Sequence, residues 1–309
     1  MTLVLIRFAE LGLKSQRVRS RFLRMFAQDI EESMISNGVE HIMEVERSRI
    51  FIEVEDFDGA ARVLRQVPGV HSFSLVMPAA SDKASLMFSL SEYGAGTIRE
   101  GMSYGLKVRR TGETGYTSQE IAVEGGGAVV SHLPEGSAHV DLKAPDIWIE
   151  VEIRGRKAYI FHERFRGMGG MPASSQGRVI LYMPPLPEEG DARDELVKRA
   201  FLSHELMRRR GCRVIPVARE EDVLTWRTEL RRSHLTMDID PIPGFDEIGK
   251  MLVDASLGNY ARGVLCPFGL EGIEGFPVLH SAGEPLPMFY PTVSMNGSDL
   301  DGWLKERFI

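Results

Sequence analysis

The last part of the chain alternates strand-like and helix-like segments, and this order constrains the fold more than any other feature of the sequence. Strand patterns at residues 179–183, 213–217, 235–239 and 263–266 are separated by helical patterns at residues 191–210, 220–230 and 245–257. Strands that are joined through helices form a parallel sheet with right-handed crossovers. Residues 177–309 are therefore expected to form an α/β, Rossmann-like domain whose ligands would lie at the carboxyl ends of the strands.

Residues 1–166 carry two smaller patterns that contain both strands and helices. Residues 1–77 read as strand 3–8, helix 17–36, strand 50–54, helix 57–65 and a last apolar strand after Pro68-Gly69. Residues 78–166 read as helices 84–100 and 118–131 with strands 106–109, 139–142, 147–153 and 157–161. The first order is typical of a small α+β sandwich, and the second is expected to form an α/β domain. The glycine-rich residues 167–176 are expected to be a linker.

The composition is that of an ordinary globular protein. Of the 309 residues, 43% are hydrophobic and 26% are charged, and the net charge is −7. The N-terminal apolar run stops at Arg7, and no stretch approaches the roughly 18 apolar residues of a membrane span, so we expect a cytoplasmic protein without a membrane partner. Cys212 and Cys266 stand far apart without a Cys-x-x-Cys motif, which argues against a disulfide framework or a metal site.

Positive residues are concentrated in three groups despite the negative net charge. Lys14, Arg17, Arg19, Arg21 and Arg24 form the first group, Lys107, Arg109 and Arg110 the second, and Arg154, Arg156, Lys157, Arg164 and Arg166 the third. Such groups suit docking against a phosphate backbone, although a solvated surface explains each of them equally well. Strand alternation would put Lys107 and Arg109 on one face and Arg110 on the other.

Polar side chains near the second group allow a structural and a binding interpretation. Thr117 and Ser118 precede a helical run, where a hydroxyl caps free amides and where a phosphate could also bind. Asp141 and Asp146 flank Lys143, and in the simpler interpretation they stabilise a turn. The residues alone leave both interpretations open.

Four stretches of the chain, in this order, resemble the tRNA 4-thiouridine synthetases. Residues 4–14 are similar to that family's opening strand and R-Y-G-E-x-x-L-K-G motif, and a basic helix follows them. Residues 106–120 and 140–146 resemble the signature of the THUMP domain. Residues 164–172 resemble the link into the family's PP-loop pyrophosphatase domain.

The resemblance implies three domains and an RNA partner. We expect a ferredoxin-like domain at residues 1–77, a THUMP domain at 78–166, and an adenine nucleotide alpha hydrolase-like, PP-loop domain at 177–309. It also implies a homodimer and recognition of tRNA, not DNA, through backbone shape and a single-stranded end. The residues expected to bind RNA are Lys14, Arg17, Arg19, Arg21, Arg24, Lys107, Arg109, Arg110, Thr117, Ser118, Gln119, Lys143, Arg164 and Arg166.

The chain departs from that family where its nucleotide loop is expected. Family members carry S-G-G-x-D-S after the first strand of the last domain, and its amides and hydroxyl hold the ATP pyrophosphate. This chain has Met183, Pro184 and Pro185 there, and proline has no N–H to donate. Pro267 stands where a second, glutamine-rich loop would contact the nucleotide.

Three functions follow from these observations. The expected one is an RNA-binding protein that needs no cofactor or metal. It is expected to have lost the nucleotide loop. It is also expected to lack the relay cysteine, because the sequence stops at Ile309. The second is a tRNA sulfurtransferase that uses ATP and Mg²⁺ at a non-standard site, with Cys266 or a partner supplying sulfur, although a buried, inert Cys266 is the simpler interpretation. The third is a subunit of another tRNA-modifying enzyme, such as a methyltransferase. Against it, the sequence lacks the glycine-rich turn that would bind a methyltransferase cofactor.

Overall fold

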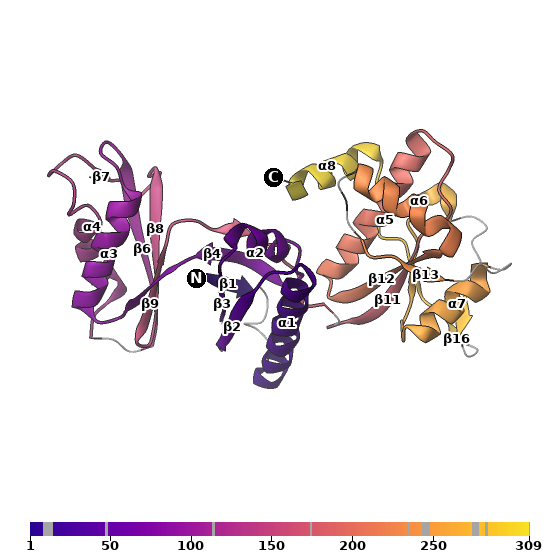
Figure 1. The fold of residues 1–309 in the computed structure, drawn as a ribbon, viewed down its shortest axis with the longest axis horizontal. Helices are drawn as coiled ribbons and strands as arrows, with labels where there is room; N and C mark the ends of the chain where they lie inside the picture. Colours follow the sequence, from indigo (N-terminus) through magenta and orange to yellow (C-terminus); the bar gives the residue numbers. More distant parts are fainter. Residues whose placement is uncertain are drawn as a thin grey trace. The chain divides into compact units, whose positions relative to one another are not determined.

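The structure is a computed structural model. It describes residues 1–8, 15–46, 49–112, 115–173, 175–233, 235, 237–242, 248–273, 278–281 and 284–308. The chain forms two compact units, one of residues 1–8, 30–66 and 70–167 and the other of residues 9–29, 67–69 and 168–309. The first unit contains two five-stranded sheets, and the second contains the parallel sheet (Figure 1).

The first sheet has the strand order β10-β4-β1-β3-β2, with antiparallel neighbours throughout. Its elements are β1 (Thr2–Phe8), α1 (Gln16–Ser36), β2 (His41–Glu46), β3 (Arg49–Val54), α2 (Phe57–Leu64), β4 (Val70–Leu75) and β10 (Phe165–Arg166). The order β-α-β-β-α-β is that of a ferredoxin-like domain. Phe26, Ile30 and Met34 of α1 are fully buried, as their four-residue spacing predicts.

Two strands of this sheet were not predicted from the sequence. β2 is an edge strand whose Ile42 is 59% exposed and whose Val45 is also exposed, so its apolar residues do not mark a buried face. β10 is only two residues long, too short to show a pattern, and Phe165 pairs with Phe73 of β4. Residues 165–166 therefore join the ferredoxin-like sheet after the chain has passed through the second sheet.

The second sheet has the order β5-β9-β8-β6-β7. Its elements are β5 (Met77–Ala80), α3 (Lys83–Thr97), β6 (Ser103–Thr111), α4 (Ser118–Ala128), β7 (His139–Val140), β8 (Ile147–Arg154) and β9 (Lys157–Phe161). Leu90 of α3 and Ile121 of α4 share a core with Leu106 and Ile149, so both helices cover one face of the sheet. We call the opposite face, with Lys107, Trp148 and Tyr159, the helix-free face.

The ferredoxin-like sheet packs against part of the helix-free face. Leu5 and Phe51 share a core with Tyr159 and Phe161 of β9, and the Phe51 and Tyr159 rings stack with their centroids 4.6 Å apart. The two domains of the first unit are thus joined by a hydrophobic contact. Burial of these large rings contributes roughly 1.5–3 kcal/mol for each side chain that leaves water completely.

The third sheet is entirely parallel, with the order β13-β12-β11-β14-β17. Its strands are β11 (Gly177–Tyr182), β12 (Cys212–Arg219), β13 (Asp240–Ile242), β14 (Val264–Leu265) and β17 (Met288–Phe289), and its helices are α5 (Asp191–Arg209), α6 (Glu220–Arg232), α7 (Ile248–Gly258) and α8 (Gly297–Phe308). A two-stranded sheet, β15 (His280–Ser281) and β16 (Glu284–Pro285), stands apart from it.

The parallel sheet confirms the α/β architecture, but one strand is displaced from its predicted position. Leu235 and Ile239 are buried in the core beside Trp226, and the paired strand β13 begins only at Asp240. Burial of apolar side chains next to the sheet therefore produced a strand-like pattern before the strand itself. No helix within the described ranges has both the length and the apolar character needed to cross a lipid bilayer.

Candidate nucleic-acid interface and nucleotide loop

The second basic group lies at the end of β6 and is exposed. Leu106 and Val108 face the helix-covered core, so Lys107 and Arg109 project from the helix-free face, the alternation that the sequence predicts. The Lys107 ammonium lies 3.5 Å from the centroid of the Trp148 ring. Arg110 is exposed at the strand end and donates from its guanidinium to the Gly112 carbonyl at 3.3 Å.

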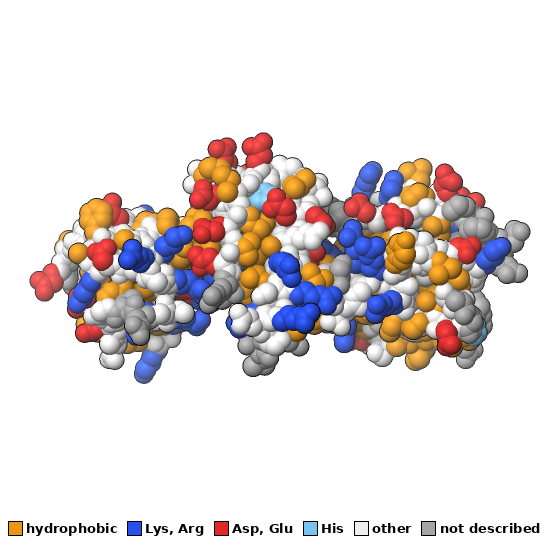
Figure 2. All heavy atoms as spheres, turned by 90° about the horizontal axis from the view of Figure 1, so that it is seen from below, with side chains coloured by type: hydrophobic (Ala, Val, Ile, Leu, Met, Phe, Trp, Pro, Cys, Tyr) orange, Lys and Arg blue, Asp and Glu red, His pale blue; other side chains and the backbone are white. Residues whose placement is uncertain are grey.

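The first basic group forms a stripe along α1. Arg17, Arg21 and Arg24 are exposed, and their spacing of four and three residues puts them on one helix face. Arg19 is partly buried, and Lys14 lies outside the described residues. Lys and Arg side chains form separate groups among acidic and hydrophobic ones in Figure 2, consistent with local basic surfaces on an acidic protein.

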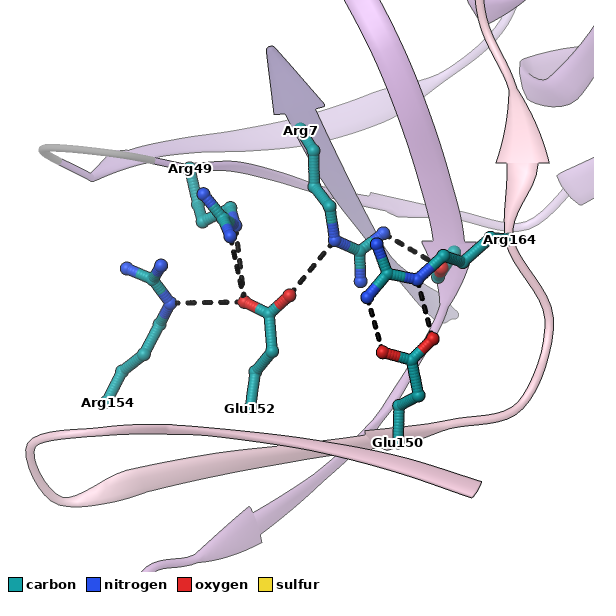
Figure 3. A network of polar contacts seen from close by, with 7 residues as sticks. Arg7, Arg49, Glu150, Glu152, Arg154 and Arg164 are labelled. Carbon is teal, nitrogen blue, oxygen red and sulfur yellow. Dashed lines mark hydrogen bonds and ion pairs between the residues drawn. The ribbon is translucent and has the colours of Figure 1, made fainter. Parts of the chain in front are cut away.

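The third basic group contains residues that are held by carboxylates. Arg164 forms a two-pronged ion pair with Glu150, with Nε at 2.6 Å from Oε1 (Figure 3). Arg166 is exposed on β10. A guanidinium that already binds a carboxylate at two points presents less of its charge to a phosphate than a lone lysine or arginine does.

A buried carboxylate connects the ferredoxin-like and THUMP-like sheets. Glu152 of β8 accepts a hydrogen bond from Arg7 Nε of β1 at 3.0 Å, and Arg49 of β3 donates to it at 3.2 Å. Arg154 Nε lies 3.5 Å from the same carboxylate (Figure 3). Arg7 also donates to the Ser74 hydroxyl at 2.9 Å and lies over the Phe161 ring.

Burial and ion pairing act in opposite directions on Glu152. Its side chain is only 5% exposed, and that burial disfavours the charged form. The charges of Arg49 and Arg7 and their hydrogen bonds outweigh burial, so the net effect is a lowered pKa for Glu152. The sequence analysis missed this network. Its signal in the sequence is the presence of three charged residues, Glu150, Glu152 and Arg154, at alternate positions of a strand that is otherwise apolar.

Thr117 begins helix α4 through a capping box. Its hydroxyl accepts from the Glu120 N–H at 3.1 Å, and the Glu120 carboxylate accepts from the Thr117 N–H at 2.5 Å. Ser118 is the first helical residue, and Gln119 is exposed after it. Hydrogen bonds from Thr117 lower the pKa of Glu120. The capping box therefore already uses the N–H groups of Thr117 and Glu120 at this helix start.

Asp141 and Asp146, which flank Lys143, both accept hydrogen bonds from backbone N–H groups. Asp141 accepts from the N–H groups of Lys143 and Ala144, and Asp146 accepts from the Ser103 N–H and hydroxyl, both at 2.7 Å. The Asp141 contacts stabilise a turn, as in the simpler interpretation, whereas Asp146 joins the residue before β8 to Ser103 at the start of β6. These contacts leave the Lys143 side chain exposed at the surface.

The turn after β11 directs carbonyl groups toward donors of its own domain. The Pro184 carbonyl accepts from the buried Trp226 Nε1 at 2.8 Å. Arg193 of α5 donates to the carbonyls of Pro187 and Glu188 at 2.9 and 2.6 Å. Met183 is fully buried, and its N–H donates to Val217 of the neighbouring strand at 2.9 Å, whereas Pro185 is exposed.

Acidic residues surround this turn at the carboxyl edge of the sheet. Helix α5 has Asp191 and Asp194 in its first turn, and α6 has Glu220, Glu221 and Asp222. Both helices follow strands of the parallel sheet, so both N-termini lie at the edge where ligands of this architecture bind. Burial and the neighbouring Glu221 charge raise the pKa of Asp222. The α6 acids were not singled out from the sequence.

Cys266 lies deep in the same domain. It has no exposed surface, and burial raises the pKa of its thiol to about 12. Pro267 follows it and is buried, and the Tyr182 and Phe268 rings meet edge to face nearby. A hollow of about 290 Å³ lies elsewhere, between Lys250 and Val253 of α7 and residues 278–280. Within the part of the chain that the structure describes, no group of three or more His, Cys, Asp or Glu residues is placed to hold a metal ion.

Two domain models match the first part of the chain. A model of the ThiI ferredoxin-like domain matches residues 3–74, and a model of the THUMP domain matches residues 95–163. A probable tRNA sulfurtransferase of Methanothermobacter thermautotrophicus is 33% identical over 219 residues, which are 69% of this chain and 51% of the relative. A tRNA sulfurtransferase of Thermoplasma acidophilum is 31% identical over 58% of this chain and 36% of its own length. The chain spans about half the length of the first of these relatives.

Solved structures resemble the whole chain. A crystal structure of PH1313 from Pyrococcus horikoshii has a TM-score of 0.73 at 23% identity and covers 100% of this chain and 99% of its own. A 4-thiouridine synthetase bound to RNA and ATP has a TM-score of 0.71 at 15% identity, covering 99% of this chain and 85% of its own. At these identities the likeness concerns the fold.

Proposed function

Because the chain belongs to the tRNA sulfurtransferase family by its ferredoxin-like and THUMP domains, we propose that it binds tRNA but does not activate it with ATP. The sulfurtransferase relatives act on tRNA by name, and the related 4-thiouridine synthetase was solved with RNA. Exposed Lys107, Arg109 and Arg110 on the THUMP domain and the arginine stripe of α1 supply charges that suit RNA phosphates.

The turn after β11 is the single observation that carries the proposed loss of ATP chemistry. A triphosphate needs several backbone N–H groups pointing at it, ideally at a helix N-terminus. Of residues 184–187 only Leu186 has an N–H, and the carbonyls of Pro184 and Pro187 already accept hydrogen bonds from Trp226 and Arg193. These residues do not fit the pyrophosphate of ATP.

The charge around the turn supports the same proposal. Asp191 and Asp194 begin α5, and Glu220 and Glu221 begin α6. Carboxylates stabilise a helix N-terminus, but they repel a triphosphate and take the place of the anion that such a terminus could bind. We therefore propose that no ATP or Mg²⁺ is held at this edge, and we derive no chemical step through them.

The second candidate function is the ATP-dependent sulfur transfer for which the relatives are named. It requires a reactive thiolate, and the thiolate fraction falls as the pKa rises. Cys266 is fully buried with a pKa of about 12, and burial also raises the pKa of Cys212. Both thiols are therefore neutral near pH 7, which favours the non-catalytic proposal.

Binding and activation are tested by separate measurements on the same protein. We expect fluorescence anisotropy with labelled tRNA to show binding that weakens as salt rises, since phosphate contacts dominate it. We expect incubation with ATP, Mg²⁺, tRNA and a sulfide donor to yield no AMP, pyrophosphate or thiolated uridine above the protein-free control. Absence of tRNA binding would contradict the first half of the proposal, and tRNA-dependent release of AMP would contradict the second.

A further inference from the structure

The helix-free face of the THUMP sheet carries an aromatic ring in an unusual setting. Trp148 of β8 pairs in register with Gly105 of β6, and its ring lies over that glycine. A Cβ atom at position 105 would meet ring carbons at 2.4 and 2.6 Å, so only glycine admits the ring there. The indole is therefore held against the sheet by the backbone beneath it, and it remains partly exposed.

The exposed side of this arrangement is positively charged. The Lys107 ammonium lies on the Trp148 ring, and Arg109 follows on the same strand face. The nearby carboxylates Glu150 and Glu152 are in ion pairs with arginines. Around this face the cations Arg49, Lys107, Arg109, Arg154, Lys157 and Arg164 outnumber the carboxylates Glu44, Glu46, Glu150 and Glu152.

A flat aromatic ring beside a surplus of cations fits one chemical class of ligand. Unpaired nucleobases stack on aromatic side chains while the adjacent phosphates bind lysine and arginine. A double-stranded A-form helix keeps its bases stacked inside and cannot offer one to the ring. An acidic peptide would satisfy the cations but has no flat group to cover the indole.

We propose that Trp148 is a stacking platform for an unpaired nucleobase of the bound RNA, and that Lys107 moves from the ring to an adjacent phosphate on binding. In the free protein the ammonium covers the ring through a cation–π contact, which at an exposed site is weaker than a base stack. The lysine charge thus has a favourable contact in both states, with the ring in the free protein and with a phosphate in the complex. This inference rests on the proposed RNA binding and assigns it a site.

Tryptophan fluorescence reports directly on this site. The chain has three tryptophans, of which Trp226 is fully buried and Trp303 contacts Arg209. We expect a short single-stranded oligoribonucleotide to quench the emission of the unaltered protein, and a blunt duplex of the same sequence to leave it unchanged. Trp148→Phe should lose the quenching, while the matched control Trp303→Phe should keep it.

Affinity measurements separate a stacking role from a structural one. Trp148→Ala should weaken binding of the single strand by about 5- to 100-fold, and Trp148→Phe, which keeps an aromatic ring, should recover most of that loss. Lys107→Met should keep the quenching. It should lower the slope of log affinity against log salt by about 1, because one phosphate contact is lost. Circular dichroism checks that each variant is folded.

The outcomes distinguish this site from RNA binding as such. If the protein binds tRNA but neither quenching nor affinity depends on Trp148, the stacking site is wrong and the proposed function stands. Equal quenching by the duplex would equally contradict the site. If the unaltered protein binds neither tRNA nor the single strand, the proposed function fails and the stacking site fails with it.

Discussion

At the scale of single residues, the burial of charged side chains determines which substitutions the first unit tolerates. The Glu152 carboxylate contacts Arg7, Arg49 and Arg154 together. Charged groups leave water at a large cost, which their mutual attraction offsets only while every partner is present. Strand alternation correctly predicted that Lys107 and Arg109 share one exposed face, because the direction of a side chain along a strand is a local property. It could not predict Arg7 and Glu152, which lie 145 positions apart and meet only in the folded chain.

Removal of the Glu152 charge should destabilise the first unit. Glu152→Gln removes the carboxylate that the buried Arg7 and the partly buried Arg49 both contact, so we expect a loss of about 3–5 kcal/mol in the free energy of unfolding. Urea denaturation followed by circular dichroism measures it. Glu92→Gln, at an exposed position of α3, is the matched control and should change stability by less than about 0.5 kcal/mol. Equal stability of the two variants would contradict the coupling.

The same residue predicts how stability depends on pH. The pKa of Glu152 in the folded chain is below its ordinary value of 4.5, so its ion pairs contribute fully above pH 4.5. That contribution is lost as pH falls from 4.5 through the lower, folded value, because over this range the unfolded state takes up a proton that the folded state does not yet bind. The difference in unfolding free energy between the unaltered protein and Glu152→Gln should therefore shrink from pH 7 to pH 3. A difference that stays constant over this range would contradict the lowered pKa.

At the scale of elements, local chemistry predicted helices better than edge strands. A hydroxyl before an apolar helical pattern predicted the start of α4, and Thr117 does cap it. β2 and β10 were missed because an edge strand buries little and a two-residue strand has no period. The strand predicted at residues 235–239 was displaced because Leu235 and Ile239 are buried in the core without belonging to a strand. Tertiary packing decided these three cases.

The capping box of α4 gives a prediction at this scale. Thr117→Ala removes the acceptor for the Glu120 N–H, and we expect the free energy of unfolding to fall by about 1 kcal/mol. Thr117→Ser keeps a hydroxyl in place and should stay within a few tenths of a kcal/mol of the unaltered protein. Thermal and urea unfolding compare the two. If Thr117→Ala is as stable as Thr117→Ser, the cap does not contribute.

At the scale of the whole molecule, the domain order was predictable and the sites only partly so. The α/β pattern and the motif resemblance predicted the ferredoxin-like, THUMP and parallel-sheet folds, which the structure and the domain models confirm. The expected RNA-binding residues stay a prediction. The structure adds Trp148 beside Lys107, and it shows that Arg164 and Thr117 have partners within the protein. Side-chain partners from distant strands are the information that a linear pattern lacks.

The second basic group provides the test at this scale. Replacing Lys107, Arg109 and Arg110 together with alanine should weaken tRNA binding and lower the slope of log affinity against log salt by about 2 to 3. The control replaces three exposed arginines outside the basic groups, Arg62, Arg213 and Arg231, with alanine and should leave the slope nearly unchanged. Filter binding over a salt series measures both. Equal slopes for the two triple variants would show that these charges do not contact phosphates.

The short strand β10 has a consequence for how this protein can be taken apart. The polypeptide leaves the ferredoxin-like sheet after β4 and re-enters it at β10, where Phe165 stacks on Phe73 with ring centroids 5.4 Å apart. The THUMP domain is thus inserted between two strands of the ferredoxin-like sheet, β4 and β10, and is connected to that sheet at both of its ends. The THUMP strands β5 to β9 all lie within residues 77–161, so it is the ferredoxin-like sheet that a truncation before residue 165 damages, by removing β10. A fragment that ends before residue 77 would leave unpaired the edge of β4 that pairs with β10. A deletion of the THUMP domain that keeps β10 must therefore join the chain near residue 76 to the chain near residue 165.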